Sequence, residues 1–153
     1  VTDNEDVLIA CILHDILEDV ALKHPDIYNE QLMRQDFGDK VTNIVKDVTH
    51  DDSIYNWHKR KRHYLDHLLN HAQDEAIIVS ACDKIHNLLT IVEDYKLHGQ
   101  KLARRFKFNS LTEQVWFYKE THKVLYARKA PKSLLDQYDH WLTEIQQLLA
   151  KDS

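Results

Sequence analysis

Apolar residues recur along this chain at every third or fourth position, which is the spacing of one face of an α-helix. The pattern predicts a first helix to about Val20, capped by Asn4 and with acidic residues in its first turn. After a break at residues 23–26, it predicts a short amphipathic helix that stops at Gly38. The apolar face of this short helix consists of Ile27, Leu32, Met33 and Phe37.

Helical spacing continues through the rest of the chain. Further helices are predicted at about residues 41–48, 57–71, 74–94, 112–128 and 133–150. A polar loop is expected at residues 49–53, and the basic stretch 96–111 is either a flexible cover or a short helix. No useful length of chain alternates at period two, so we predict an all-α fold, a bundle of about six to eight helices.

The composition agrees with one helical domain over residues 1–153. A chain of 153 residues can bury a substantial core by itself. Its 2 glycines and 2 prolines favour long helices with few tight turns. The formal net charge of -5 argues against broad binding to a nucleic-acid backbone, which requires a basic face. A small phosphate-bearing ligand stays compatible with this charge.

The chain is expected to be soluble and cytoplasmic. Cys11 and Cys82 both lie in apolar periodic segments, where a reduced cysteine behaves as a small buried hydrophobe. No apolar stretch reaches the roughly 18 residues that span a bilayer, and no signal sequence opens the chain. The chain begins with Val1 rather than methionine, which suggests a processed or trimmed N-terminus.

The stretch HDILED, residues 14–19, places an imidazole and three acids inside an apolar run. On a helix, His14 shares a face with Glu18, and Asp15 shares one with Asp19. The adjacent His14 and Asp15 can reach one cation, and this donor set suits manganese, iron, magnesium or zinc. The alternative is that these residues line a solvated helix end.

Asp83 presents a similar problem in the middle of another helix. It lies between Cys82 and Ile85 in the stretch VSACDKIHNLLTI, where an unpaired carboxylate is costly. If this helix packs against the first, Asp83 completes a cluster of one histidine and two aspartates. The alternative is a partly exposed Asp83 paired with Lys84 or Lys46.

These two motifs carry a family resemblance. HDILED followed by ACDKIHNLLT resembles the HD-domain metal-dependent phosphohydrolases, whose patterns are HDxxED and ADRLHNxRT or ADKLHN. Within them, the chain is most similar to the hydrolase domain of RelA/SpoT-type alarmone enzymes and to the small stand-alone alarmone hydrolases. The segment FGDKVTNIVKDVTHD is similar to their FGxxVxxLVxxVT, and VWFYKETHKVL resembles a later segment weakly. The resemblance covers about residues 7–128.

The resemblance implies roles for individual residues. The implied metal is a divalent ion, Mn²⁺, and its ligands are His14, Asp15 and Asp83. The acids that position and activate the attacking water are Glu18 and Asp19. The residues that contact the nucleoside are Asn87 and Thr90, which share the helix face of Asp83.

The chain departs from the family pattern in three places. The first metal ligand of the family is a histidine one helix upstream, and residues 1–13 contain none, so the chain has either lost that helix or binds metal incompletely. Val20 stands where threonine is frequent. Lys84 replaces the arginine of the bifunctional enzymes and agrees with the small hydrolases.

A basic run at residues 59–62 is either a solvated helix face or, as the resemblance implies, a pyrophosphate anchor to which Lys61 and Arg62 contribute. A weaker candidate of the same kind consists of Lys101, Arg104 and Arg105. His50 is a remote candidate for a substitute metal ligand. The histidines on polar stretches are expected at the surface: His24, His58, His63, His67, His71, His98, His122 and His140.

The leading hypothesis is a cytoplasmic, manganese-dependent phosphohydrolase that removes pyrophosphate from the 3′ position of guanosine alarmones. Its partner is then a small nucleotide, with no nucleic acid and no membrane, and a homodimer is left open. One alternative is an HD hydrolase of another nucleotide or phosphate ester. The other is a catalytically silent HD module that binds a nucleotide or a protein partner.

Overall fold

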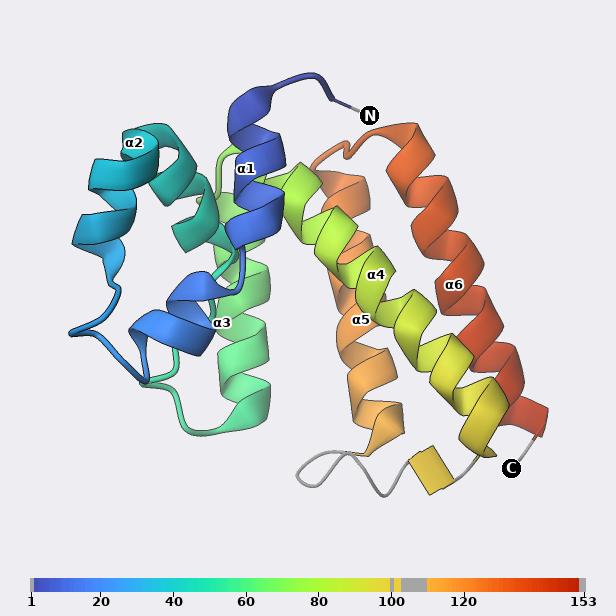
Figure 1. Cartoon of the computed structure of the whole chain (residues 1–153). Coiled ribbons are helices and arrows are strands. Elements are labelled where there is room, and N and C mark those ends of the chain that lie inside the picture. The colour runs from blue at the N-terminus through green and yellow to red at the C-terminus, as the bar shows by residue number, and fades with distance from the viewer. Residues whose placement is uncertain (1, 100, 103–109, 152–153) are drawn as a thin grey trace. The chain divides into compact units, whose positions relative to one another are not determined.

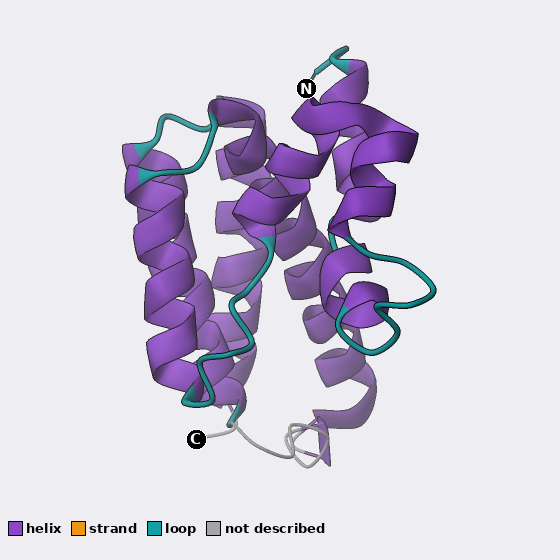
Figure 2. Ribbon diagram, turned by 90° about the vertical axis from the view of Figure 1, so that its left-hand side faces the viewer, coloured by secondary structure: helices purple, strands orange, loops and turns teal. Residues whose placement is uncertain are grey.

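The computed structural model of this protein describes residues 2–99, 101–102 and 110–151. Within those ranges it contains helices joined by loops and no strand (Figure 1, Figure 2). The elements in chain order are α1 (Glu5–Leu13), the π-helical segment η1 (Leu17–Ala21), α2 (Glu30–Val48), α3 (Trp57–Asn70), α4 (Asp74–His98), α5 (Leu111–Ala127) and α6 (Lys132–Lys151). The predicted all-α helical bundle is confirmed.

The chain divides into two compact units, Val1–Ser80 and Ala81–Ser153, with the division inside α4. In the first unit, α1 and η1 pack against α2, and α2 also packs against α3. In the second unit, α5 packs against α6. The two sequence motifs, HDILED and ACDKIHN, therefore belong to different units.

The starts of several helices follow from side-chain capping. The first amides of a helix have no partner within the helix, so a polar side chain just before them stabilises the start. Asn4, Asn29 and Asn56 each accept a hydrogen bond from an amide in the helix that follows. Ser110 does the same for α5 and forms a capping box with Glu113.

Apolar side chains at helical spacing build the interior of each unit. In α2, Val41, Ile44 and Val45 are fully buried, as their periodicity predicted. In the second unit, the buried Tyr138 of α6 donates its hydroxyl hydrogen to the backbone oxygen of Tyr118 in α5, at 3.0 Å. This bond lets a large aromatic ring enter the core without leaving its hydroxyl unsatisfied.

The short helix expected at residues 27–37 is only partly correct. The helix begins at Glu30, so Ile27 lies in the preceding turn and is 66% exposed. Gly38 interrupts α2 with φ 81° and ψ 172°, as the sequence predicted for a stop at this residue. Phe37, directly before that break, is 39% exposed rather than buried.

Two other expectations change in detail. The first helix ends at Leu13 instead of Val20, and α4 continues to His98, which takes in the start of the basic stretch 96–111. Most of the rest of that stretch, residues 103–109, lies outside the described residues. Cys11 and Cys82 are half-buried rather than fully buried. Among the described helices, none combines the length and apolar character required to cross a membrane.

Candidate metal and phosphate site

The His14–Asp15 pair lies where α1 ends. His14 is the C-cap residue that follows α1, and its Nδ1 lies 2.8 Å from the backbone oxygen of Cys11. A carbonyl oxygen only accepts hydrogen bonds, so Nδ1 carries the proton and a neutral ring keeps its lone pair on Nε2. Histidines that bind metals usually hold their second nitrogen in this way, which fixes the ring and its tautomer.

The two side chains fit a divalent cation. His14 Nε2 lies 3.1 Å from Asp15 Oδ2, so two electron-pair donors face one another and require a proton or a cation between them. With metal–ligand bonds of about 2.1 Å, two neighbouring ligands at a right angle are about 3 Å apart. Within neither unit do the described residues group three or more His, Cys, Asp or Glu side chains for a metal. The first unit thus contributes this pair of donors.

The local backbone explains why the predicted helix stops early. The His14 ring donates a hydrogen bond to the carbonyl oxygen of Cys11. The amides of Glu18 and Asp19 both donate to the carbonyl oxygen of Asp15, at 3.1 and 2.8 Å. The chain then widens into the π-helical segment η1. Such segments are rare and occur frequently at functional sites.

The acids of η1 have different partners. Asp19 is largely exposed and forms an ion pair with Lys23 at 3.2 Å. Glu18 is more buried, and its Oε1 accepts the backbone amide of His50 at 2.6 Å and lies 2.9 Å from His50 Nδ1. Glu18 is therefore anchored to the loop after α2, whereas Asp19 faces solvent.

His50, a remote candidate for a metal ligand in the sequence, contacts side chains of two helical elements in the structure, η1 and α3. Its side chain is 9% exposed, and its Nε2 lies 2.9 Å from the Nζ of Lys61 on α3. Lys61 therefore contacts the same histidine as Glu18, while the neighbouring Arg62 is exposed. The sequence shows only a histidine in a polar loop, and nothing in that pattern indicates that its side chain is buried.

Asp83 lies in the second unit beside the ammonium group of Lys84. Its side chain is 13% exposed, and it forms an ion pair with Lys84, whose side chain is 8% exposed. Asn87 donates from Nδ2 to Asp83 Oδ1 at 2.6 Å, and the Lys84 ammonium lies 5.9 Å from the centroid of the Phe117 ring. The pairing with Lys84 that the sequence left as an alternative is thus present.

These contacts balance the buried charge of Asp83 and leave its predicted role as a ligand untested. Lys46, the other partner considered for Asp83, binds Glu30 at 2.9 Å within the first unit. His14 and Asp15 belong to one unit and Asp83 to the other, so their joint binding of one ion stays a prediction.

The remaining predicted substrate contacts lie at exposed positions. Thr90 is exposed and donates its hydroxyl hydrogen to the backbone oxygen of His86 at 3.0 Å. Lys101 is exposed as well. Arg104 and Arg105 lie outside the described residues.

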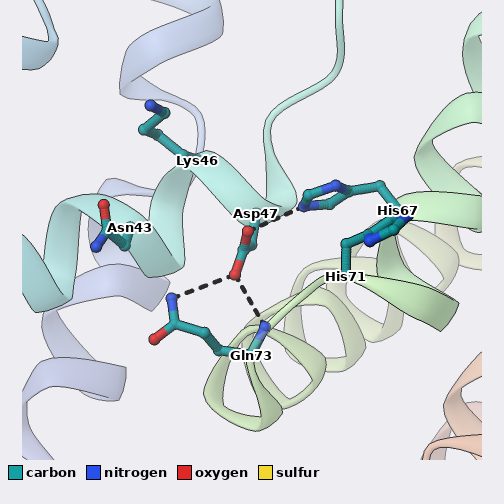
Figure 3. Close-up of a pocket in the computed structure, with 6 residues that line it drawn as sticks. All are labelled: Asn43, Lys46, Asp47, His67, His71 and Gln73. Atoms are coloured by element: carbon teal, nitrogen blue, oxygen red, sulfur yellow. Dashed lines mark hydrogen bonds and ion pairs between the residues drawn. The ribbon is translucent and has the colours of Figure 1, made fainter.

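The first unit also contains a polar pocket of about 430 Å³ that the motifs did not indicate (Figure 3). Its lining residues are Asn43, Lys46, Asp47, His67, His71 and Gln73. Asp47 Oδ1 lies 2.9 Å from His67 Nε2, and Asp47 Oδ2 accepts the backbone and side-chain N–H groups of Gln73 at 2.9 and 3.2 Å. His67 lies at the surface, as expected, with part of its side chain covered by this contact.

Burial also affects one tyrosine of the second unit. The enclosed phenol of Tyr118 has its pKa raised to about 12, chiefly because burial disfavours the phenolate. The positive charge of Lys84 lowers this pKa and the negative charge of Asp83 raises it, so these two effects oppose one another.

Comparison with known proteins gives a family match and similar proteins. Residues 2–116 match the protein family described as HD domain. Over 82 residues, the chain is 35% identical to guanosine-3′,5′-bis(diphosphate) 3′-pyrophosphohydrolase MESH1 of Xenopus tropicalis, an alignment that covers 54% of this chain and 41% of that protein. The chain therefore spans well under half the length of the relative that it matches.

A solved structure has the same fold. The crystal structure of lmo0812 from Listeria monocytogenes EGD-e superposes with a TM-score of 0.76 and covers 93% of this chain and 88% of its own. The sequences are 22% identical. At that identity the similarity establishes the helical fold alone, and the chemistry has to be argued from the side chains.

Proposed function

Because the chain belongs to the HD domain family, we propose that it is a metal-dependent phosphohydrolase that removes pyrophosphate from the 3′ position of guanosine 3′,5′-bis(diphosphate). The observation that carries this proposal is the geometry of His14, whose Nδ1 is bound to a backbone oxygen and whose Nε2 faces Asp15. The similarity to MESH1, a 3′-pyrophosphohydrolase by name, supports the choice of substrate.

In this proposal the metal ligands are His14, Asp15 and Asp83, and the ion is Mn²⁺. A bound divalent ion lowers the pKa of water and neutralises phosphate charge. The Cys11 carbonyl keeps the His14 ring in the tautomer that offers Nε2 as a donor. Asn87, which donates to Asp83 Oδ1, orients that carboxylate.

The acids of η1 position and activate the attacking water. Glu18 is held at Oε1 by two N–H donors of His50, so its carboxylate has a defined orientation from which to accept a proton. Asp19, which is exposed beside it, orients the water. Attack of the water on the 3′ phosphorus breaks the bond to the nucleoside 3′ oxygen. That oxygen takes up the proton that Glu18 accepted from the water, and pyrophosphate is released.

The substrate contacts complete the proposal. Lys61 and Arg62 on α3 bind the pyrophosphate, because cationic side chains offset its negative charge. Asn87 and Thr90, four and seven residues beyond Asp83 on the same helix, contact the nucleoside. In this proposal the partner of the chain is therefore a small nucleotide, its substrate.

The test is release of pyrophosphate from guanosine 3′,5′-bis(diphosphate) with and without Mn²⁺. In the enzymes that the chain resembles, a histidine precedes the His-Asp pair by one helix, so a chain extended upstream of Val1 should be assayed beside residues 1–153. Asp83→Ala should abolish release. Asp83→Asn, which keeps an oxygen for Lys84 and Asn87, separates loss of the ligand charge from loss of folding.

Glu93→Ala is the matched control, because Glu93 is an exposed acid on the same helix. Manganese-dependent pyrophosphate release in the wild type and in Glu93→Ala, but in neither Asp83 variant, supports the proposal. Release of inorganic phosphate from ordinary nucleotides instead indicates an HD hydrolase with another substrate. Absence of metal binding by calorimetry, even in the extended chain, contradicts both enzymatic functions and favours a silent binding module.

A further inference from the structure

Three side chains of the first unit form a continuous polar chain that connects the two roles assigned to this unit. Glu18 of η1 contacts His50 in the loop after α2, and His50 contacts Lys61 of α3. Both contacts are 2.9 Å long, and they use opposite nitrogens of the same ring. The acid proposed to act on water and the cation proposed to bind phosphate are thus joined through one imidazole.

The partners determine the state of the His50 ring. An ionised carboxylate only accepts hydrogen bonds and an ammonium group only donates them. Nδ1, which faces Glu18, therefore carries the ring proton, and Nε2, which faces Lys61, presents its lone pair. The ring is neutral in this arrangement, because a proton on Nε2 would point at the ammonium group.

The ring is also fixed in space. Tyr64 of α3 stacks on His50 with ring centroids 4.3 Å apart and planes inclined by 17°. The Tyr64 hydroxyl in turn lies 2.9 Å from the buried hydroxyl of Ser80. The stacked tyrosine restricts rotation of the imidazole, so both hydrogen bonds depend on one orientation of the ring.

We propose that His50 is a positioning residue that couples phosphate binding at Lys61 to the orientation of Glu18. This inference rests on the proposed function, because it uses the roles assigned there to Lys61 and Glu18. Lys61 also lies over the Trp57 ring, 5.9 Å from its centroid, so its ammonium is held near one place. When that ammonium binds a phosphate, its hydrogen bond to His50 Nε2 changes. The imidazole ring transmits this change to its hydrogen bond with the Glu18 carboxylate.

Two substitutions separate the His50–Glu18 contact from the His50–Lys61 contact. In His50→Asn, the amide nitrogen replaces Nδ1 and donates to Glu18, but the side chain is too short to reach Lys61. In His50→Gln, the longer side chain places its oxygen near the position of Nε2 for Lys61 and gives up the bond from Nδ1 to Glu18. The backbone amide of residue 50 still donates to Glu18 in both variants.

We expect His50→Asn to raise KM by about tenfold with kcat nearly kept, since it frees Lys61 from its partner. We expect His50→Gln to lower kcat by about tenfold to a hundredfold with KM nearly kept, since it loosens the carboxylate. A residue with a merely structural role would change both constants in the same way in both variants. His50→Ala should show both changes together.

The assay uses the full chain, Mn²⁺ and guanosine 3′,5′-bis(diphosphate), with circular dichroism to show that each variant is folded. His63→Asn is the control, because His63 is exposed on the same helix as Lys61. An active wild type with equal kinetic constants in the two His50 variants overturns this inference and leaves the proposed function intact. A wild type inactive even in the extended chain overturns the proposed function and this inference with it.

Discussion

Replacing Asp47 tests how strongly one side chain holds the first unit together. Asp47 stands in the last turn of α2 and accepts bonds from His67 on α3 and from Gln73 just before α4 (Figure 3). Its side chain is 16% exposed. Asp47→Ala removes all three bonds and leaves the backbone amide of Gln73 without that acceptor.

The expected cost follows from these contacts. A hydrogen bond to a charged group contributes about 1.5–3 kcal/mol when it is well shielded. The His67 contact counts for less, because the His67 side chain is 36% exposed and screened by solvent. We therefore expect Asp47→Ala to lower the free energy of unfolding by about 3 kcal/mol. With a urea dependence of about 2 kcal/mol per molar, the midpoint falls by about 1.5 M.

Urea unfolding followed by circular dichroism measures this change. Asp47→Asn keeps one oxygen for the Gln73 amide and should lose about half as much. Asp66→Ala is the control, since Asp66 is an exposed acid on α3 that accepts a hydrogen bond from the exposed Asn70 side chain at 2.9 Å. Its effect should stay within about 0.5 kcal/mol. If Asp47→Ala behaves like Asp66→Ala, the pocket contacts do not stabilise the unit as described.

Two further predictions concern stability. The raised pKa of Tyr118, about 12 against the ordinary 10.0, means that burial of the neutral phenol stabilises the fold fully below pH 10 and that this contribution is lost as the pH rises through 12. Relative to Tyr118→Phe, the wild type should lose about 2 kcal/mol between pH 9 and pH 12 in urea unfolding, and parallel pH profiles would contradict this. Gly38→Ala should cost about 1–3 kcal/mol in thermal unfolding, because φ 81° and ψ 172° strain any side-chain-bearing residue even though nothing lies within 4 Å of the added Cβ. An unchanged melting temperature would show that the break at Gly38 relaxes.

Local signals in the sequence were enough for most helices. The caps at Asn4, Asn56 and Ser110 and the spacing of buried residues in α2 depend only on neighbours within a few positions. Side chains three and four positions apart meet on every α-helix, whatever surrounds it. This is why element type and most boundaries were predictable, including the break at Gly38.

The early end of α1 was not predictable in this way. The sequence pattern continues to Val20. In the structure, however, the His14 ring donates a hydrogen bond to the carbonyl oxygen of Cys11, and the next turn widens into η1. A periodicity of apolar residues does not record how a polar side chain competes with the backbone for a hydrogen bond. Glu18 consequently binds His50 rather than acting as a neighbour of His14 on a regular helix face.

By itself, the sequence determined the all-α class, the HD family and the residues that are candidates for chemistry, because these rest on composition, period and motif. Only the tertiary structure decided the partners of the polar residues: His50 between Glu18 and Lys61, and Asp47 between His67 and Gln73. Those partners are 11 to 32 positions apart along the chain. Their pairing depends on which helix faces meet, and the energy that selects those faces is the burial of the apolar residues beneath them.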